Sequence, residues 1–112
     1  MTADRLMREL FEWWQERTDA ERAIRLFHET VVVDTLVGGP VQEWIRLETL
    51  IEPMENVTVI AKAADSSRAA MLFEGVDPVA GVRHRISWFL TASEGRITSF
   101  ALNCAIAPSE SA

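Results

Sequence analysis

The feature that most constrains the fold is a change in the spacing of apolar residues near Asn56. Beyond this point apolar and polar residues alternate with a period of two, as expected for strands. The segments between the alternating runs are short and carry turn residues, such as Asp77-Pro78 and Glu94-Gly95. Short links favour hairpins, so an antiparallel meander is predicted. The predicted strands are Asn56–Ala63, Arg68–Glu74, Val82–Thr91 and Arg96–Ile106.

Helical spacing dominates the part of the chain before Asn56. A first amphipathic helix is predicted to end near Glu16, with an apolar face of Leu6, Met7, Leu10, Phe11 and Trp14. Thr18 followed by Glu21 is a capping-box pattern that predicts the start of a second helix. The inner face of that second helix is expected to comprise Ala23, Ile24 and Phe27.

The residues between the second helix and Asn56 predict one further strand and one further helix. A β-branched run indicates a strand over residues 30–37, which Gly38-Gly39-Pro40 ends. A third helix is expected to start at or just after Pro40 and to stop at Pro53. Its apolar face would be Val41, Trp44, Ile45, Leu47 and Ile51.

Helices grouped ahead of an antiparallel meander indicate an α+β fold, with three helices covering one face of the sheet. The length of 112 residues suits one domain and is too short for two. A hydrophobic content of 48% excludes wholesale disorder. We expect one domain over residues 1–107 and a flexible tail over residues 108–112.

The charge balance argues against some classes of partner. Asp and Glu number 17 against 11 Lys and Arg, which gives a net charge of −6. A surface this acidic repels phosphate backbones, so neither nucleic acid nor an anionic membrane is an expected partner. No apolar run approaches the length needed to span a bilayer, and no signal-peptide pattern is present at the start.

Cysteine and histidine usage bears on compartment and cofactors. Cys104 is the single cysteine and cannot form an internal disulfide, which fits a reducing, cytoplasmic location. It lies in an apolar run and is expected to be a small buried hydrophobe. The two histidines, His28 and His84, are far apart and match no metal-ligand spacing, and there is no glycine-rich phosphate loop. Neither a metal nor another cofactor is therefore expected.

Several short sequence segments resemble those of the superfamily of nuclear transport factor 2, SnoaL-like polyketide cyclases and ketosteroid isomerases. The segments are Ile24–Glu29 followed by Val31–Pro40, and Trp88-Phe89-Leu90 followed by Glu94–Ile97. The resemblance covers about Leu6 to Ala105. It implies a strongly curved, cone-shaped sheet wrapped around a long helix and enclosing a mostly apolar pocket. It does not fix the activity, because this fold carries isomerases, cyclases, hydrolases and binding modules.

Asp34 is the candidate catalytic residue. Along its predicted strand it shares a face with Val32 and Leu36, so its carboxylate would lie among apolar side chains. Desolvation there disfavours the charged form and suits a general base. The alternative is a solvated carboxylate near a strand end. The resemblance implies the catalytic role, because Asp34 falls where ketosteroid isomerases keep their proton-transferring carboxylate.

The hydrogen-bond donors of those isomerases do not carry over. The chain has 4 Trp, 5 Phe and no Tyr. Phe11 stands where the family places a Tyr on the first helix, and Ser87 stands where it places a protonated Asp. A phenyl ring cannot donate a hydrogen bond, so any acid partner must come from Ser, Arg, Trp, His or water.

Alternation on the Val82–Thr91 strand divides its side chains between two faces. We assign Arg83, Arg85, Ser87 and Phe89 to the interior, although a one-residue shift would exchange Arg85 for His84. The expected substrate-binding residues are Phe11, Trp14, Arg85, Ser87, Phe89 and Phe100. An ion pair between the two arginines and Glu74 is the alternative. Trp13 and Trp14 are either pocket donors or core residues.

Two functions of different classes follow. The first is a cofactor-independent isomerase or cyclase that acts on a small apolar carbonyl compound, with Asp34 as its base. The second is a non-catalytic ligand-binding or dimerisation module, with a homodimer formed through Ile86, Trp88 and Leu90 on the outer face of the sheet. An epoxide hydrolase is disfavoured, because the resemblance places Leu102 where that branch needs a second Asp.

Overall fold

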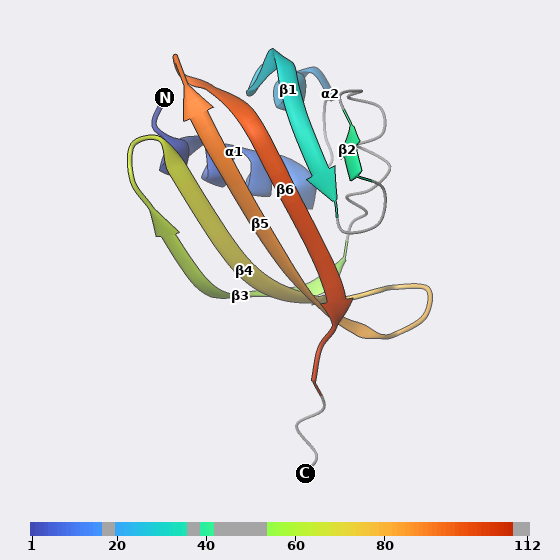
Figure 1. Cartoon of the computed structure of the whole chain (residues 1–112). Coiled ribbons are helices and arrows are strands. Elements are labelled where there is room, and N and C mark those ends of the chain that lie inside the picture. The colour runs from blue at the N-terminus through green and yellow to red at the C-terminus, as the bar shows by residue number, and fades with distance from the viewer. Residues whose placement is uncertain (17–19, 36–38, 42–53, 109–112) are drawn as a thin grey trace.

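The computed structural model describes residues 1–16, 20–35, 39–41 and 54–108. Within these ranges two helices precede the strands (Figure 1). They are α1 (Ala3–Glu16) and α2 (Ala20–Ile24). The strands are β1 (Phe27–Thr35), β2 (Gly39–Val41), β3 (Glu55–Ala64), β4 (Arg68–Val76), β5 (Arg83–Ser93) and β6 (Arg96–Ile106).

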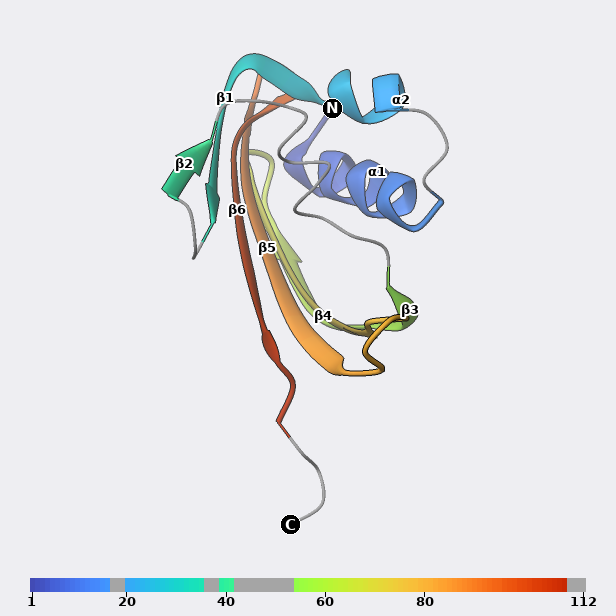
Figure 2. The same ribbon diagram turned by 90° about the vertical axis from the view of Figure 1, so that its right-hand side faces the viewer.

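The described strands form one sheet in the order β2-β1-β6-β5-β4-β3. β3, β4, β5 and β6 make the predicted antiparallel meander, and β1 joins it parallel to β6. The sheet curves strongly, and both helices lie on its concave side (Figure 2). The α+β prediction is thus confirmed.

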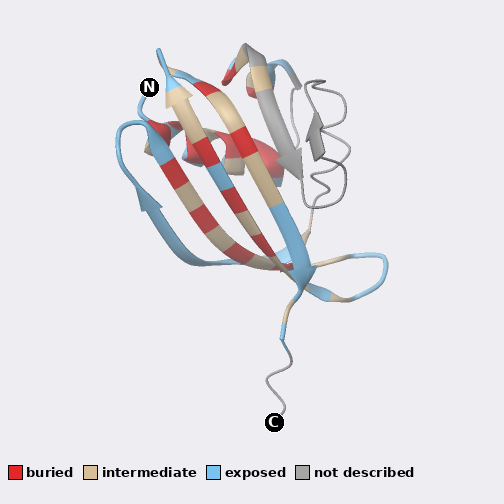
Figure 3. Cartoon of the chain, in the orientation of Figure 1, coloured by how far each residue is buried: buried red, intermediate tan, exposed pale blue. Residues whose placement is uncertain are grey.

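The helix α1 fills the concavity. Thr2 caps it, because its hydroxyl oxygen accepts a hydrogen bond from the Arg5 N–H at 3.3 Å. Its buried face comprises Ala3, Leu6, Met7, Leu10, Trp13 and Trp14, which confirms the predicted helical periodicity. Figure 3 shows buried bands alternating with less buried ones along β4 and β5, the strands that face this helix.

The helix α2 is short and is tied to α1 by one arginine. The Arg22 guanidinium pairs with Glu16 at 2.9 Å, and with Glu9 and Glu12 at 3.4 Å each. The hydrogen bond with Glu16 is the main reason why the pKa of Arg22 is raised. The predicted extension of this helix through Phe27 is wrong, because α2 ends at Ile24 and Phe27 begins β1. Phe27 is buried as expected, but from a strand.

The prediction of a third helix lies mostly outside the described residues, which omit 42–53. A start at Pro40 or Val41 is wrong, because both residues belong to β2. The Pro40 backbone is in register with Asp34 of β1. Proline tolerates this position because β2 is an edge strand of the described sheet. The predicted tail beyond Pro108 and the capping residue Thr18 also fall outside the described residues.

The turn between β5 and β6 shows why its sequence predicted a hairpin. Ser93 pairs with Arg96, and the two residues between them, Glu94 and Gly95, have φ angles of 55° and 76°. Two successive residues with positive φ make a type I′ turn, whose twist matches that of the flanking strands. Glycine adopts this conformation at little cost.

Candidate functional site

The concave face of β5 carries the even-numbered residues, so the predicted assignment of its two faces is wrong. Ile86, Trp88 and Leu90 are 4%, 1% and 0% exposed, whereas Phe89 is 46% exposed. Trp88 is in register with Met71 of β4 and with Leu102 of β6, and these residues share the concave face. Ile86, Trp88 and Leu90 therefore form part of the core and cannot form the outer interface that we expected.

Arg85, Ser87 and Phe89 lie on the outer face and do not line the interior. Arg85 donates two hydrogen bonds to Glu74 Oε2, from Nε at 2.9 Å and from Nη2 at 2.7 Å. Arg83 Nη1 lies 3.5 Å from Glu74 Oε1. The ion pair that the sequence left as an alternative is thus present, and it holds both arginines away from the concave side.

The concave face instead holds a cluster of five aromatic rings from α1 and three strands, which we call the interior cluster. Phe73 lies at its centre, with its centroid 5.1 Å from that of Trp14, 5.1 Å from that of Trp88 and 5.2 Å from that of Phe11. Phe100 completes the cluster, 5.5 Å from Trp88. Three predicted binding residues, Phe11, Trp14 and Phe100, therefore do come together.

Trp88 carries the one polar group that the structure leaves unpaired in this cluster. Among the described residues, its indole Nε1 is the buried side-chain nitrogen or oxygen that has no hydrogen-bond partner. A buried donor without an acceptor costs about 1–3 kcal/mol of folding free energy. Such a group calls for a specific explanation, because buried polar atoms are nearly always satisfied.

Sequence reasoning missed Trp88 and Phe73 as residues of this interior, although a usable signal existed. On β4 the buried residues are Ala69, Met71, Phe73 and Gly75, so Glu74 is on the opposite face. Across an antiparallel pair, Glu74 is in register with Arg85. An ion pair between them therefore puts Arg85 on the outer face, and Trp88 on the inner one.

The proposed base, Asp34, lies on β1, and its side chain is outside the described residues. Its backbone is in register with Ala101 of β6, which in turn pairs with Phe89 of β5. The preceding residue, Val33, is in register with Phe100 of the interior cluster. His28 also lies in β1.

Cys104 and the potential metal ligands lie outside the interior cluster. Cys104 is exposed, which corrects its expected burial, although partial desolvation raises the pKa of its thiol. It pairs with Ile86 on the concave side, near the end of β6. In the described ranges, no three His, Cys, Asp or Glu side chains are grouped so that they could hold a metal ion. No helix within the same ranges is long and apolar enough to cross a bilayer.

No family model matches the chain, and no curated protein matches its sequence. Solved structures do match its fold. A ketosteroid isomerase-like protein from Kribbella flavida has a TM-score of 0.75 and 18% identity, over 94% of this chain and 78% of that one. An NTF2-like protein of unknown function from Cytophaga hutchinsonii has a TM-score of 0.73 and 15% identity, over 94% of this chain and 91% of that one.

A third similar structure is an LEH-like epoxide hydrolase from M. tuberculosis, with a TM-score of 0.70 and 15% identity over 92% of this chain and 82% of that one. These likenesses rest on backbone geometry, since so few residues are identical. The strongly curved sheet closed by α1 is what the structures share. The chain therefore has the nuclear transport factor 2-like fold that its sequence segments predicted.

Proposed function

We propose that the chain binds a small, largely apolar carbonyl compound on the concave side of its sheet. We further propose that it transfers a proton on this compound without a cofactor, as an isomerase- or cyclase-type enzyme. The observation that carries the proposal is the buried Trp88 N–H, which has no acceptor among the described residues. A carbonyl oxygen is the acceptor that such a donor lacks, and the neighbouring rings suit an apolar ligand body.

The chemistry needs a base and a group that stabilises negative charge. In the proposed step the Asp34 carboxylate takes a proton from the carbon next to the carbonyl, and the electron pair moves to the carbonyl oxygen to give an enolate. The Trp88 N–H donates a hydrogen bond to that oxygen, but keeps its proton because indole is a donor only. Return of the proton from Asp34 to another carbon completes an isomerisation. A donor aimed at the developing charge is typically worth about 3–4 kcal/mol.

Binding without chemistry is the second candidate, and the register of β1 favours it. The Asp34 backbone is in register with Ala101, which pairs with Phe89 of the outer face. The Val33 backbone is in register with Phe100. Phe100 belongs to the interior cluster, so it is Val33 and not Asp34 that is in register with this cluster. A binding module needs the Trp88 donor and the apolar rings, but no base.

We also propose that the chain forms a homodimer, but through different residues from those that the sequence predicted. Phe89 and Ile60 are each 46% exposed, and Phe89 lies on the outer face. We propose that a second copy packs on this face. Phe89→Lys is expected to shift a dimer to monomers in analytical ultracentrifugation, and a wild-type monomer at high concentration would contradict the proposal.

The test uses cyclohex-3-enone, whose isomerisation to cyclohex-2-enone is followed by ultraviolet absorbance. We expect wild-type protein to accelerate it and Asp34→Asn to reduce the rate by about 100-fold or more, the usual range for a lost general base. Trp88→Phe removes the donor and keeps a ring, whereas Trp13→Phe is the matched control on α1. Both variants alter a buried indole, but only Trp88→Phe is expected to slow the reaction.

Binding is measured separately through the indole N–H signals in ¹H–¹⁵N NMR spectra. A ketone that shifts the Trp88 signal without any Asp34-dependent turnover supports the binding module. If none of a panel of cyclic ketones shifts this signal, both candidates are wrong.

A further inference from the structure

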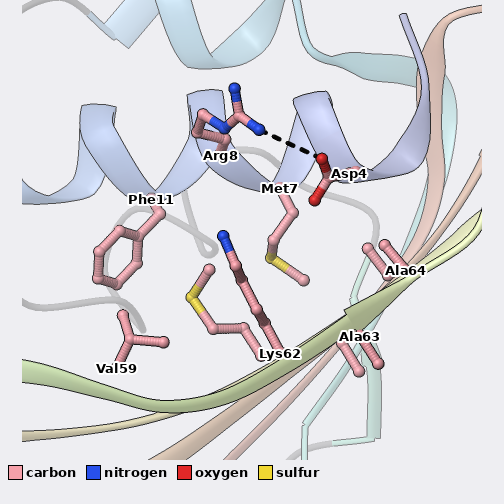
Figure 4. A pocket seen from close by; sticks show the side chains of 11 residues that line it. Asp4, Met7, Arg8, Phe11, Val59, Lys62, Ala63 and Ala64 are labelled. Atoms are coloured by element: carbon pink, nitrogen blue, oxygen red, sulfur yellow. Dashed lines mark hydrogen bonds and ion pairs between the residues drawn. The ribbon is translucent and has the colours of Figure 1, made fainter.

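A cavity adjoins the interior cluster, with which it shares Phe11, and lies between α1 and the edge strand β3 (Figure 4). Its volume is about 260 Å³. Met7 and Phe11 of α1 form one wall, and Val59, Ala63 and Met71 of β3 and β4 form the opposite wall. The lining is thus mostly apolar, and an apolar ligand body would fit there.

The charged residues of this cavity differ in how they are paired. Asp4 and Arg8 lie one helical turn apart and form an ion pair at 3.3 Å, so they offset each other. Lys62 is the only lysine in the sequence. It is in register with Met71, and its ammonium group projects from β3 toward α1, between Phe11 and Met7. It has no ion pair or hydrogen bond in the part of the chain that the structure describes.

We propose that this cavity is a binding site for a small amphipathic carboxylate, whose apolar body lies against Phe11 and Met71 and whose carboxylate pairs with Lys62. The proposal goes beyond the function proposed above and does not depend on it. An unpaired cation beside an apolar wall favours a ligand that carries an anion at one end of an apolar chain. Lys62 supplies this charge on a protein whose net charge is −6.

The size of the cavity limits the ligand. At about 30 Å³ for each water-sized group, a volume of 260 Å³ holds about eight or nine non-hydrogen atoms. Hexanoate has eight such atoms and therefore serves as the probe.

Lys62 also has a purely structural interpretation. β3 is an edge strand of the described sheet, and an inward-pointing lysine on an edge strand opposes edge-to-edge aggregation. In that case removal of its charge would promote self-association and would leave hexanoate binding unchanged. The two interpretations therefore predict different results for one variant.

Binding is measured from the methyl signals of ¹³C-methionine-labelled protein. Met7 and Met71 line the cavity, whereas Met54 packs against Gly75 and serves as an internal control. We expect hexanoate to shift the Met7 and Met71 signals in a saturable manner, and to bind more tightly than hexan-1-ol or hexylammonium. Added salt should weaken hexanoate binding, because the contact is partly between charges.

The test variants are Lys62→Met and Lys62→Gln, and the matched control is Arg25→Met, which removes one positive charge from an exposed position directly after α2. Each Lys62 variant should weaken hexanoate binding by about tenfold, as expected for a lost charge-assisted hydrogen bond, and Arg25→Met should not. Unchanged affinity in the Lys62 variants, or hexylammonium binding as tightly as hexanoate, would overturn the proposal. So would self-association of Lys62→Met with no loss of hexanoate affinity.

Discussion

Glu74 of β4 and Arg85 of β5 face each other on the outer side of the sheet, with Arg85 Nη2 2.7 Å from Glu74 Oε2. The Glu74 side chain is only 14% exposed, whereas that of Arg85 is 41% exposed. The two hydrogen bonds to one carboxylate oxygen link neighbouring strands on the face opposite to the buried Ile86, Trp88 and Leu90. Arg85 is thereby a structural cation, although its position in the sequence suggested a role in the pocket.

The first prediction is that Arg85→Met lowers the free energy of unfolding by about 1 kcal/mol, because the pair is only partly shielded from water. Ligand affinity in the interior should stay unchanged. Urea unfolding of Arg85→Met, Glu74→Gln and the double variant measures the coupling between the two residues. Loss of ligand binding with unchanged stability in Arg85→Met would show that the arginine acts in the site after all.

The strands of the second half were predictable because alternation and turn residues are local signals. β6 spans Arg96–Ile106 as predicted, and β3 and β4 extend beyond their predicted ranges by one or two residues. β5 begins one residue later and ends two residues later than predicted. Which face of β5 is buried was not predictable from β5 alone. It presents Trp88 on one side and Phe89 on the other, so both faces contain a large ring.

Long-range pairing limited the prediction of the first half. Phe27 suits the apolar face of a helix, but it pairs with Ile97 of β6, about seventy residues further along the chain. Pro40 suits the first turn of a helix, yet it pairs with Asp34 across a short edge ladder. Tertiary contacts override local propensity at both positions.

The second prediction concerns Gly75, on the inner side of β4. A Cβ there would lie 2.9 Å from Met54 Cβ and 3.4 Å from Val57 Cγ2. Gly75→Ala is therefore expected to lower the free energy of unfolding by about 1–3 kcal/mol, as in other overpacked cores. Thermal or urea unfolding measures the change. Stability equal to or above wild type would contradict this close approach.

A second substitution at Met54 identifies the atom that clashes. Met54→Ala keeps the Cβ and should not rescue Gly75→Ala, whereas Met54→Gly removes it and should restore part of the lost stability. Gly81→Ala is the control for backbone conformation. Gly81 has a φ of 70° and no atom within 4 Å of an added Cβ, so its substitution causes strain without a clash.

The third prediction is that Cys104 reacts with iodoacetamide in the folded protein, once per chain, because it is exposed and is the single cysteine. The reaction at pH 8 should be slower than in urea-unfolded chain. Desolvation raises the pKa of the folded thiol, and only the thiolate is nucleophilic. Mass spectrometry at timed intervals gives both rates. Equal rates would show that the folded protein does not perturb the thiol.

The fourth prediction concerns Asp65, in the turn between β3 and β4. Its Oδ1 accepts the backbone N–H groups of Ser67 at 2.9 Å and of Arg68 at 2.8 Å. These bonds, with the Arg68 side chain, lower the pKa of Asp65 from 3.8 to about 2. The turn also anchors α1, since the Ala3 N–H donates to the Ser66 carbonyl at 3.1 Å.

The pH dependence follows from the direction of this shift. A pKa that is lower in the folded state means that the ionised carboxylate stabilises folding, and that this contribution is complete above the unfolded pKa of about 3.9. It is lost as the pH falls from that value through about 2. Asp65→Ala should therefore be less stable than wild type at pH 7, and the difference should shrink between pH 4 and pH 2.

Urea midpoints measured at pH 7, 4, 3 and 2 test this, with Asp65→Asn as the matched variant that keeps a side-chain oxygen but has no charge. Asp65→Asn should lie between wild type and Asp65→Ala at pH 7, because its amide oxygen still accepts the two backbone hydrogen bonds more weakly. All three proteins titrate Asp77 alike, whose pKa is also lowered by backbone N–H groups, so its contribution cancels in the differences. A difference between wild type and Asp65→Ala that stays constant from pH 7 to pH 2 would show that the Asp65 charge does not stabilise this turn.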